Sequence, residues 1–141
     1  MTASQSRPAG ITILSVFFSI GAVIGVVTCI SLLFPGSILE PMWRLNPRAH
    51  ENFMQMGHWA VTLMMIVGTA CAIASIGLWR SARWGYWTAI ALITINLIGD
   101  TVNAVLGTEP KAAIGIPIAA AILAFLFSKR VRSYFAKQSL T

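Results

Sequence analysis

Three polar side chains recur on one face of an apolar stretch that spans residues 84–106. Asn96, Asp100 and Asn103 fall within about 60° of one another on a helix, because each residue advances by about 100°. Asp100 is the one ionisable residue in the central part of an apolar run. An ionisable group inside hydrocarbon is costly and marks a candidate functional site by default. A carboxyl group beside two amides can bind a cation, carry a proton or link helices by hydrogen bonds.

A second polar face occurs in the apolar stretch of residues 57–79. His58 and Thr62 lie four residues apart, and Met65 and Thr69 continue the same face. Because lipid supplies no hydrogen-bond partners, we expect this face to meet the face of Asn96, Asp100 and Asn103.

Three interpretations of these polar faces stay open. The first is structural: the amides link helices, and Asp100 is protonated or paired with a cation. Candidate partners for such a pair are Arg44, Arg48, His58 and Lys111. The second is a small polar cavity for an ion, a proton or a solute. The third is a contact with another membrane subunit.

The sequence carries no motif of a known enzyme class. It has no GxSxG, HExxH, P-loop or GxGxxG pattern, and no two carboxylates share an apolar run. Cys29 and Cys71 lack the Cys/His spacing of a zinc site. His50 and His58 lie eight residues apart across a loop, whereas a bis-histidine haem site needs the two on facing helices, so the sequence disfavours haem. We predict no enzymatic activity, no metal and no cofactor.

The composition places these polar residues in a membrane. Of 141 residues, 57% are hydrophobic and only 10% are charged, and the mean hydropathy is +0.77. A soluble domain carries roughly 25% charged residues. The net charge of +6 would indicate nucleic acid in a soluble protein, but no basic patch is interleaved with exposed aromatics. The sequence therefore predicts a lipid bilayer as partner and no nucleic acid.

Four apolar runs approach the length that a bilayer core requires, about 20 helical residues. We predict spans at 11–34, 57–79, 84–106 and 110–127, of which the last is short. Pro110 suits the first turn of the last helix, and Thr108 suits its N-cap. Short connections force antiparallel neighbours. The predicted fold class is an all-α membrane protein, a four-transmembrane-helix up-down bundle forming one domain over residues 1–141.

The basic residues predict the orientation. Seven of the ten Lys and Arg lie in the two tails and in the turn at 80–83, while the other three share the remaining loops with Glu40, Glu51 and Glu109. Basic residues prefer the cytoplasmic side of a membrane. We therefore expect cytoplasmic tails at 1–10 and 129–141.

The first loop, residues 35–56, is predicted to hold a short amphipathic segment on the outer face. Pro41 lies near the start of this short segment, and Pro47 lies at its end. The alternative is an ordered loop that caps the bundle. The apolar residues of the segment are Ile38, Leu39, Met42, Trp43 and Leu45.

Small residues predict where helices pack closely. Gly21 and Gly25 form a GxxxG motif, and Gly68 and Gly77 occur in the second apolar run. Small side chains let helix backbones approach one another in lipid. Such contacts occur within one chain or between two copies. Pro117 is expected to kink the last helix.

Five short segments carry a resemblance to a known group. They are Trp43-Arg44-Leu45-Asn46-Pro47, Gly77-Leu78-Trp79-Arg80 with Arg83-Trp84-Gly85, Asn96-Leu97-Ile98-Gly99-Asp100 with Asn103, Gly115-Ile116-Pro117, and Val131-Arg132-Ser133-Tyr134-Phe135. On these residues the chain resembles an uncharacterised family of small four-helix bacterial integral membrane proteins, a domain of unknown function. The resemblance implies a multi-pass protein of the bacterial inner membrane and attaches no activity to it.

The functional expectation follows from the missing chemistry and the small aromatic-rimmed bundle. We expect a non-enzymatic accessory or structural subunit of a membrane complex, whose partners are other membrane subunits or a second copy. The alternative is a small ion, proton or solute transporter or channel that uses Asp100.

Overall fold

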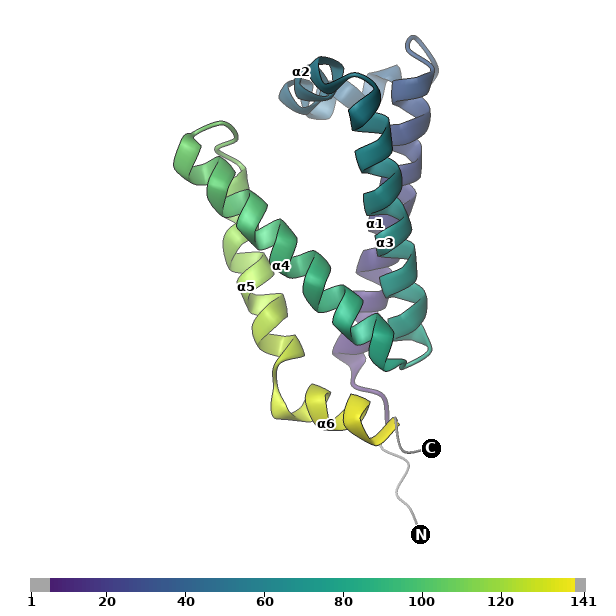
Figure 1. Ribbon diagram of the computed structural model, residues 1–141, viewed down its shortest axis with the longest axis vertical. Helices are drawn as coiled ribbons and strands as arrows, with labels where there is room; N and C mark the ends of the chain where they lie inside the picture. The colour runs from purple at the N-terminus through teal and green to yellow at the C-terminus, as the bar shows by residue number, and fades with distance from the viewer. Residues whose placement is uncertain (1–5, 139–141) are drawn as a thin grey trace. The chain divides into compact units, whose positions relative to one another are not determined.

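The computed structural model describes residues 6–138, which form seven helices and no strand (Figure 1). The helices are α1 (Ala9–Leu33), η1 (Glu40–Leu45), α2 (Pro47–Met56), α3 (His58–Trp79), α4 (Arg83–Leu106), α5 (Ala112–Leu126) and α6 (Lys129–Gln138). The all-α class predicted from the sequence is confirmed for this part of the chain. The predictions for the outermost tail residues, 1–5 and 139–141, lie outside the described residues.

Three helices are long and apolar enough to cross a membrane: α1, α3 and α4. Helices α5 and α6 meet the same length and composition criterion only as a pair, bent by 53° between them, and so give a fourth candidate span. Alone, α5 has 15 residues and a length of about 22 Å at 1.5 Å per residue. A bilayer core is about 30 Å thick. The chain is therefore a helical protein with three to four candidate membrane spans.

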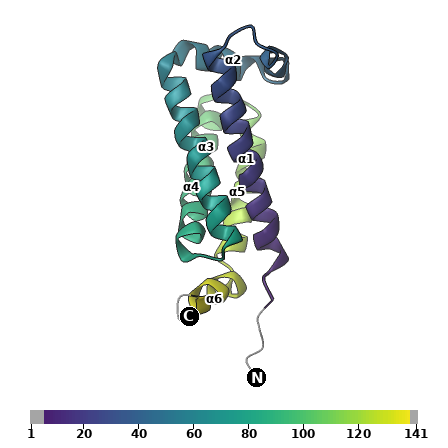
Figure 2. The same cartoon turned by 90° about the vertical axis from the view of Figure 1, so that its right-hand side faces the viewer.

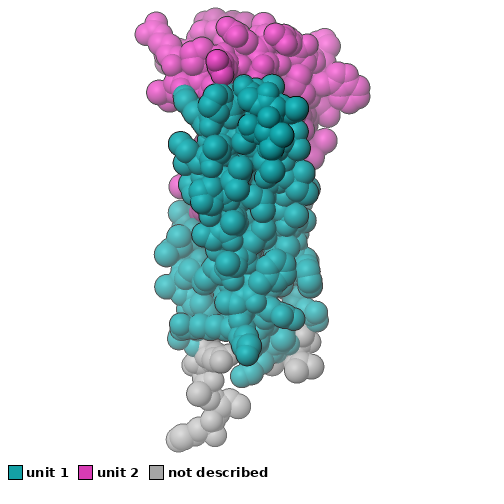
Figure 3. Space-filling model, turned by 90° about the vertical axis from the view of Figure 1, so that its left-hand side faces the viewer, with its two compact units in different colours: residues 1–16, 73–141 teal, residues 17–72 magenta. Residues whose placement is uncertain are grey.

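The chain divides into two compact units, which Figure 3 colours separately. Unit 1 comprises Met1–Val16 and Ile73–Thr141, and unit 2 comprises Phe17–Ala72. Helices α1 and α3 contribute residues to both units. Each unit is described by itself below.

In unit 2, the later part of α1 packs antiparallel against the first part of α3 (Figure 2). The partners run in opposite directions, because Gly25 meets Gly68 while Cys29 meets Val61. A methyl group on Gly25 would lie 2.8 Å from the Cα of Gly68, whereas one on Gly68 would make an ordinary contact of 3.5 Å. The backbones can approach this closely because neither position carries a side chain.

The loop of unit 2 is held to α1 by one tryptophan. Trp43 is buried, and its Nε1 donates to the Ser31 Oγ at 2.8 Å. Its ring stacks on His50 with centroids 4.5 Å apart, and Phe53 meets it edge-on. A buried indole normally needs a partner for its N–H, and here that partner lies on α1, a candidate membrane span.

The first loop contains more helix than the sequence predicted. The expected short segment is present as the two-turn η1, which ends at Leu45 just before Pro47, as predicted. A second helix, α2, was not predicted: Pro47 is its first residue, and the Asn46 side chain accepts from the Ala49 N–H at 3.2 Å as its N-cap. Asparagine before proline is a typical helix start, because proline lacks an N–H that would otherwise be unpaired.

In unit 1, the turn between α3 and α4 brings two glycine backbones together. A methyl group on either Gly77 or Gly85 would overlap backbone atoms of the other. The first turns of α1 join this end through Ser15, whose Oγ donates to the Ser75 carbonyl oxygen at 2.9 Å, and Ser75 returns the same kind of bond to Ser15.

Helices α4 and α5 form an antiparallel pair in unit 1. The Tyr86 hydroxyl of α4 donates to the Leu126 carbonyl oxygen at the end of α5, at 3.0 Å. Helix α6 then returns beneath the start of α4, where Phe135 stacks on Tyr86 with centroids 4.9 Å apart. The Tyr134 hydroxyl lies 2.7 Å from the Ser81 Oγ.

The predicted start of the last apolar helix is wrong in its capping residue. Helix α5 begins at Ala112, and Lys111 occupies its N-cap position without a side-chain bond. Thr108 completes the end of α4 instead: Gly107 adopts φ +68°, and the Thr108 N–H donates to the Asn103 carbonyl oxygen at 3.1 Å. A glycine in the left-handed region is the usual way to end a helix, and it recruits the next residue into the cap.

Candidate functional site

The polar face of α4 has a hydrogen-bonded pair at its centre. The Asn96 Nδ2 donates to the Asp100 Oδ2 at 3.0 Å, as the i,i+4 spacing on a helix allows. Asn96 is exposed, and Asp100 is half-buried. Asp100 lies six residues before the end of α4, about 9 Å along the helix axis. The pair therefore lies within the apolar length of α4.

Helix α5 leaves room for the Asp100 carboxyl group at a glycine. A methyl group on Gly115 would overlap the Asp100 Oδ2, so any other residue there would displace the carboxyl group. Pro117 follows two residues later inside the same helix. Because proline has no N–H, the Ala113 carbonyl lacks its usual i+4 donor. The carboxyl group thus faces a part of α5 where Gly115 has no side chain and where Pro117 removes one backbone hydrogen bond.

Asn103 belongs to a different structural feature. The Thr108 Oγ1 donates to its carbonyl oxygen and lies 3.3 Å from its Oδ1. Asn103 is therefore part of the C-terminal cap of α4. All three residues of the expected face lie on α4; Asn96 and Asp100 bond to each other, and the Asn103 side chain bonds to Thr108.

His58 and Thr62 lie together at the start of α3, in unit 2. The Thr62 Oγ1 donates to the His58 carbonyl oxygen at 3.3 Å, and both residues are exposed. Asp100 lies in unit 1. The predicted contact between the face of His58 and Thr62 and the face of Asp100 would be a contact between the two units, and it stays a prediction.

The predicted cation partners of Asp100 are distributed over both units. Lys111 lies in unit 1, exposed at the start of α5. Among the described residues of that unit, Asn96 is the residue that donates a hydrogen bond to the Asp100 carboxyl group. Arg44 and Arg48 lie in unit 2, so their pairing with Asp100 stays a prediction.

The four glycines predicted to pack helices lie on close helix surfaces. Gly25 and Gly68 face each other, Gly77 faces Gly85, and a methyl group on Gly21 would lie 3.3 Å from the Cys71 Sγ. Each of these contacts lies within one unit.

Arg7 has a role that the sequence did not reveal. Its Nη2 donates to the carbonyl oxygens of Leu78 and Trp79 at 2.7 and 2.5 Å, and its guanidinium group lies 5.0 Å from the Trp79 ring centre. The last carbonyls of a helix lack internal donors and carry partial negative charge. The N-terminal segment therefore caps the C-terminus of α3.

No group of three or more metal-ligating side chains occurs within residues 6–138. The features described above define an all-helical protein with three to four candidate membrane spans and a polar pair inside one of them. No protein-family model, curated protein or solved structure matches this chain.

Proposed function

We propose that this chain is a non-enzymatic accessory or structural subunit of a membrane complex in the bacterial inner membrane. It crosses the membrane four times, with both termini in the cytoplasm. The bilayer and a further membrane helix, in another subunit or a second copy, are its partners. The single observation that carries the proposal is the polar pair Asn96–Asp100 on α4.

The amide of Asn96 has unused hydrogen-bonding capacity. It is exposed, and the structure gives it one hydrogen bond, the donation to Asp100. An amide offers two donors and an acceptor with two lone pairs. Hydrocarbon satisfies none of them, whereas a polar side chain on another helix does. The pair therefore favours the docking of a partner helix on this face of α4.

The contacts at one end of unit 1 support four crossings. Arg7 bonds to the end of α3, and Tyr134 of α6 bonds to Ser81 in the turn that follows. The N-terminal segment, this turn and α6 hence lie together, and these three segments carry seven of the ten Lys and Arg. Termini at the same end require an even number of crossings, and the positive charge favours the cytoplasmic side. The short α5 crosses where the bilayer thins locally.

Cysteine labelling tests this topology. Cys29 and Cys71 are replaced by alanine, and a single cysteine is placed at Glu109 or at Arg80. A membrane-impermeant maleimide added to intact cells is expected to label Glu109→Cys and to reach Arg80→Cys only after permeabilisation. The reverse pattern would show the opposite orientation, and labelling of both sites in intact cells would contradict the proposed crossings.

Native mass spectrometry of the gently extracted complex tests the subunit proposal. The wild-type chain is expected to carry other polypeptides or a second copy, and Asn96→Leu is expected to lose them. Thr101→Val is the matched control, because Thr101 is an exposed polar residue of α4 whose hydroxyl already donates to the Leu97 carbonyl oxygen at 2.7 Å. A bare wild-type monomer, or equal loss in both variants, would contradict the proposal.

A second candidate function rests on the Asp100 carboxyl group and its position over Gly115. In this alternative the chain is a small ion, proton or solute transporter or channel, because an intramembrane carboxyl group can bind a cation or exchange a proton. The purified protein alone would then move an ion or solute into liposomes, and Asp100→Asn would abolish that flux. Flux by the purified chain would contradict the accessory-subunit proposal in favour of transport. If Asp100→Asn left that flux unchanged, Asp100 would have no role in the transport.

A further inference from the structure

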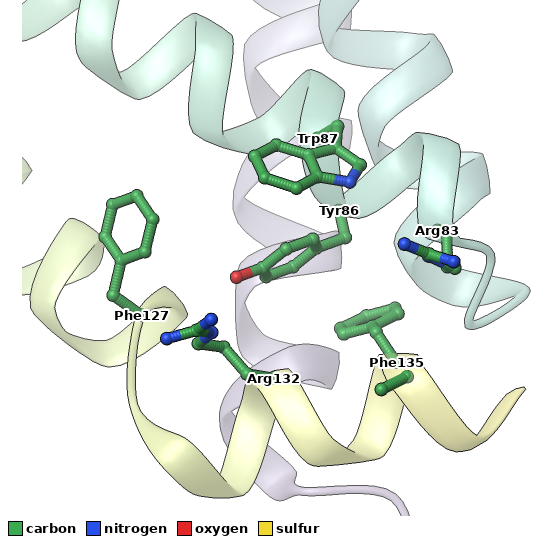
Figure 4. Close-up of a pocket in the computed structure, with 7 residues that line it drawn as sticks. Arg83, Tyr86, Trp87, Phe127, Arg132 and Phe135 are labelled. Atoms are coloured by element: carbon green, nitrogen blue, oxygen red, sulfur yellow. The ribbon is translucent and has the colours of Figure 1, made fainter. Parts of the chain in front are cut away.

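The basic end of unit 1 contains a pocket that the sequence did not indicate (Figure 4). Its volume is about 300 Å³, at the small end of the roughly 300–1,000 Å³ typical of ligand sites. Helices α4 and α6 and the end of α5 supply its walls. The lining residues are Arg83, Tyr86, Trp87, Phe127, Arg132, Phe135 and Ala136.

Two arginines from different helices provide the charge of this pocket. Arg83 opens α4, and Arg132 lies on α6; both are exposed. The four acidic residues of the chain are Glu40, Glu51, Asp100 and Glu109, so the segments around the pocket contain no acidic side chain. The first turn of α4 also lacks an acidic residue, and a helix N-terminus favours an anion. Within residues 6–138 no acidic side chain pairs with either arginine, so the pocket is lined by two guanidinium-bearing residues, and guanidinium groups bind phosphate oxygens well.

The other walls of the pocket are aromatic. The rings of Tyr86 and Phe135 stack between the two arginine-bearing helices. Trp87 and Phe127 remain 55% and 50% exposed, so they offer an apolar surface next to the charged groups. A ligand that satisfies both parts has an anionic head and an apolar tail. The pocket volume admits the head and leaves the chains outside, along α4 and α5.

Helix α6 has the pattern of a helix that lies in the membrane interface. Its buried residues are apolar or aromatic: Val131, Tyr134 and Phe135. Its four basic residues, Lys129, Arg130, Arg132 and Lys137, are all exposed. The 53° bend after α5 turns it away from the direction of the span. A basic amphipathic helix is attracted to anionic lipids at the bilayer surface.

We propose that the pocket between α4 and α6 binds the headgroup phosphate of an anionic glycerophospholipid. Arg83 and Arg132 hold the phosphate oxygens from two sides, and the acyl chains pass Trp87 and Phe127 into the bilayer. The inference needs only membrane insertion and uses neither Asn96 nor Asp100, so its failure would leave the proposed subunit function untouched.

Native mass spectrometry of the full chain from nanodiscs tests the proposal, with equal amounts of phosphatidylglycerol and phosphatidylcholine as the probes. The wild type is expected to retain phosphatidylglycerol in preference to phosphatidylcholine. Arg83→Gln with Arg132→Gln is expected to weaken retention by about tenfold, the factor that 1.4 kcal/mol corresponds to. The matched control is Arg80→Gln with Arg130→Gln, which removes the same charge from the same two segments at exposed positions outside the pocket.

The outcomes separate a built site from general attraction. Loss in the pocket variant alone supports the proposal, whereas equal loss in both variants, or in neither, overturns it. Sodium phosphate at millimolar concentration is the competitor for a soluble ligand, and displacement of the lipid by it would assign the pocket to free phosphate. Circular dichroism without phosphatidylglycerol checks that the variants fold. If the double variant fails to fold, the single change Arg132→Gln on the exposed face of α6 decides instead.

Discussion

Replacing Gly77 or Gly85 by alanine is expected to destabilise the protein more than any other glycine-to-alanine change in the chain. At the turn between α3 and α4, a methyl group on either glycine would overlap backbone atoms of the other. Backbone atoms cannot rotate away as a side chain can, so the two helices must separate. Overpacking of this kind costs typically 1–3 kcal/mol and occasionally more, and we expect about 3 kcal/mol for each variant.

The measurement is the free energy of unfolding in mixed micelles, followed by circular dichroism during titration with denaturing detergent. Gly99→Ala is the matched control, since Gly99 lies in α4 with nothing within 4 Å of an added methyl group. Alanine is favoured over glycine in a helix by about 0.5–1 kcal/mol, so the control should unfold no more easily than the wild type. If Gly77→Ala and Gly99→Ala behave alike, the close approach of α3 and α4 does not exist in the membrane.

Replacing Trp43 is expected to release the segment of η1 and α2 from α1. The side chain is only 7% exposed, bonds to Ser31 and stacks on His50. Truncation of a buried aromatic residue to alanine typically costs 3–5 kcal/mol. Trp43→Phe keeps a ring but loses the Nε1 donor and leaves the Ser31 hydroxyl without it, for a cost of about 1–2 kcal/mol.

Limited proteolysis is the direct measurement, because trypsin cuts after Arg44 and Arg48, which lie in the released segment. Cleavage there should accelerate strongly in Trp43→Ala and modestly in Trp43→Phe. Trp59→Ala is the control, as that ring is 76% exposed at the start of α3. Rapid cleavage of the wild type, or equal rates for Trp43→Ala and Trp59→Ala, would show that Trp43 does not anchor this segment.

Helix positions were predictable because helix formation depends on near neighbours. Apolar runs and the residues that interrupt them placed α1, α3 and α4 to within two residues of their observed bounds. Two helices were missed, α2 and α6, of which α6 (Lys129–Gln138) lies in the stretch predicted only as a tail. Both are short and polar, so hydropathy could not reveal them. The local start pattern of α2, Asn46 followed by Pro47, was present in the sequence and was assigned to the end of the preceding segment.

The candidate site was predictable only in its local part. Helical periodicity predicted that Asn96, Asp100 and Asn103 share a face of one helix, and all three lie on α4. The bonds along that face were not predicted: Asn96 donates to Asp100, and Thr108 donates to Asn103. Helical periodicity indicates which residues share a face. It does not indicate which of them take part in capping the end of the helix.

At the C-terminus of α3, Arg7 bonds to Leu78 and Trp79, which lie 71 and 72 positions further along the chain. No spacing rule connects residues so distant. The same holds for Gly115 beneath Asp100 and for the pocket that joins Arg83 to Arg132. The apolar spans, the bounds of the long helices and the shared face of Asn96 and Asp100 follow from composition and local periodicity. The caps, the glycine contacts and the pocket between α4 and α6 depend on how the helices pack, because only packing brings distant side chains close together.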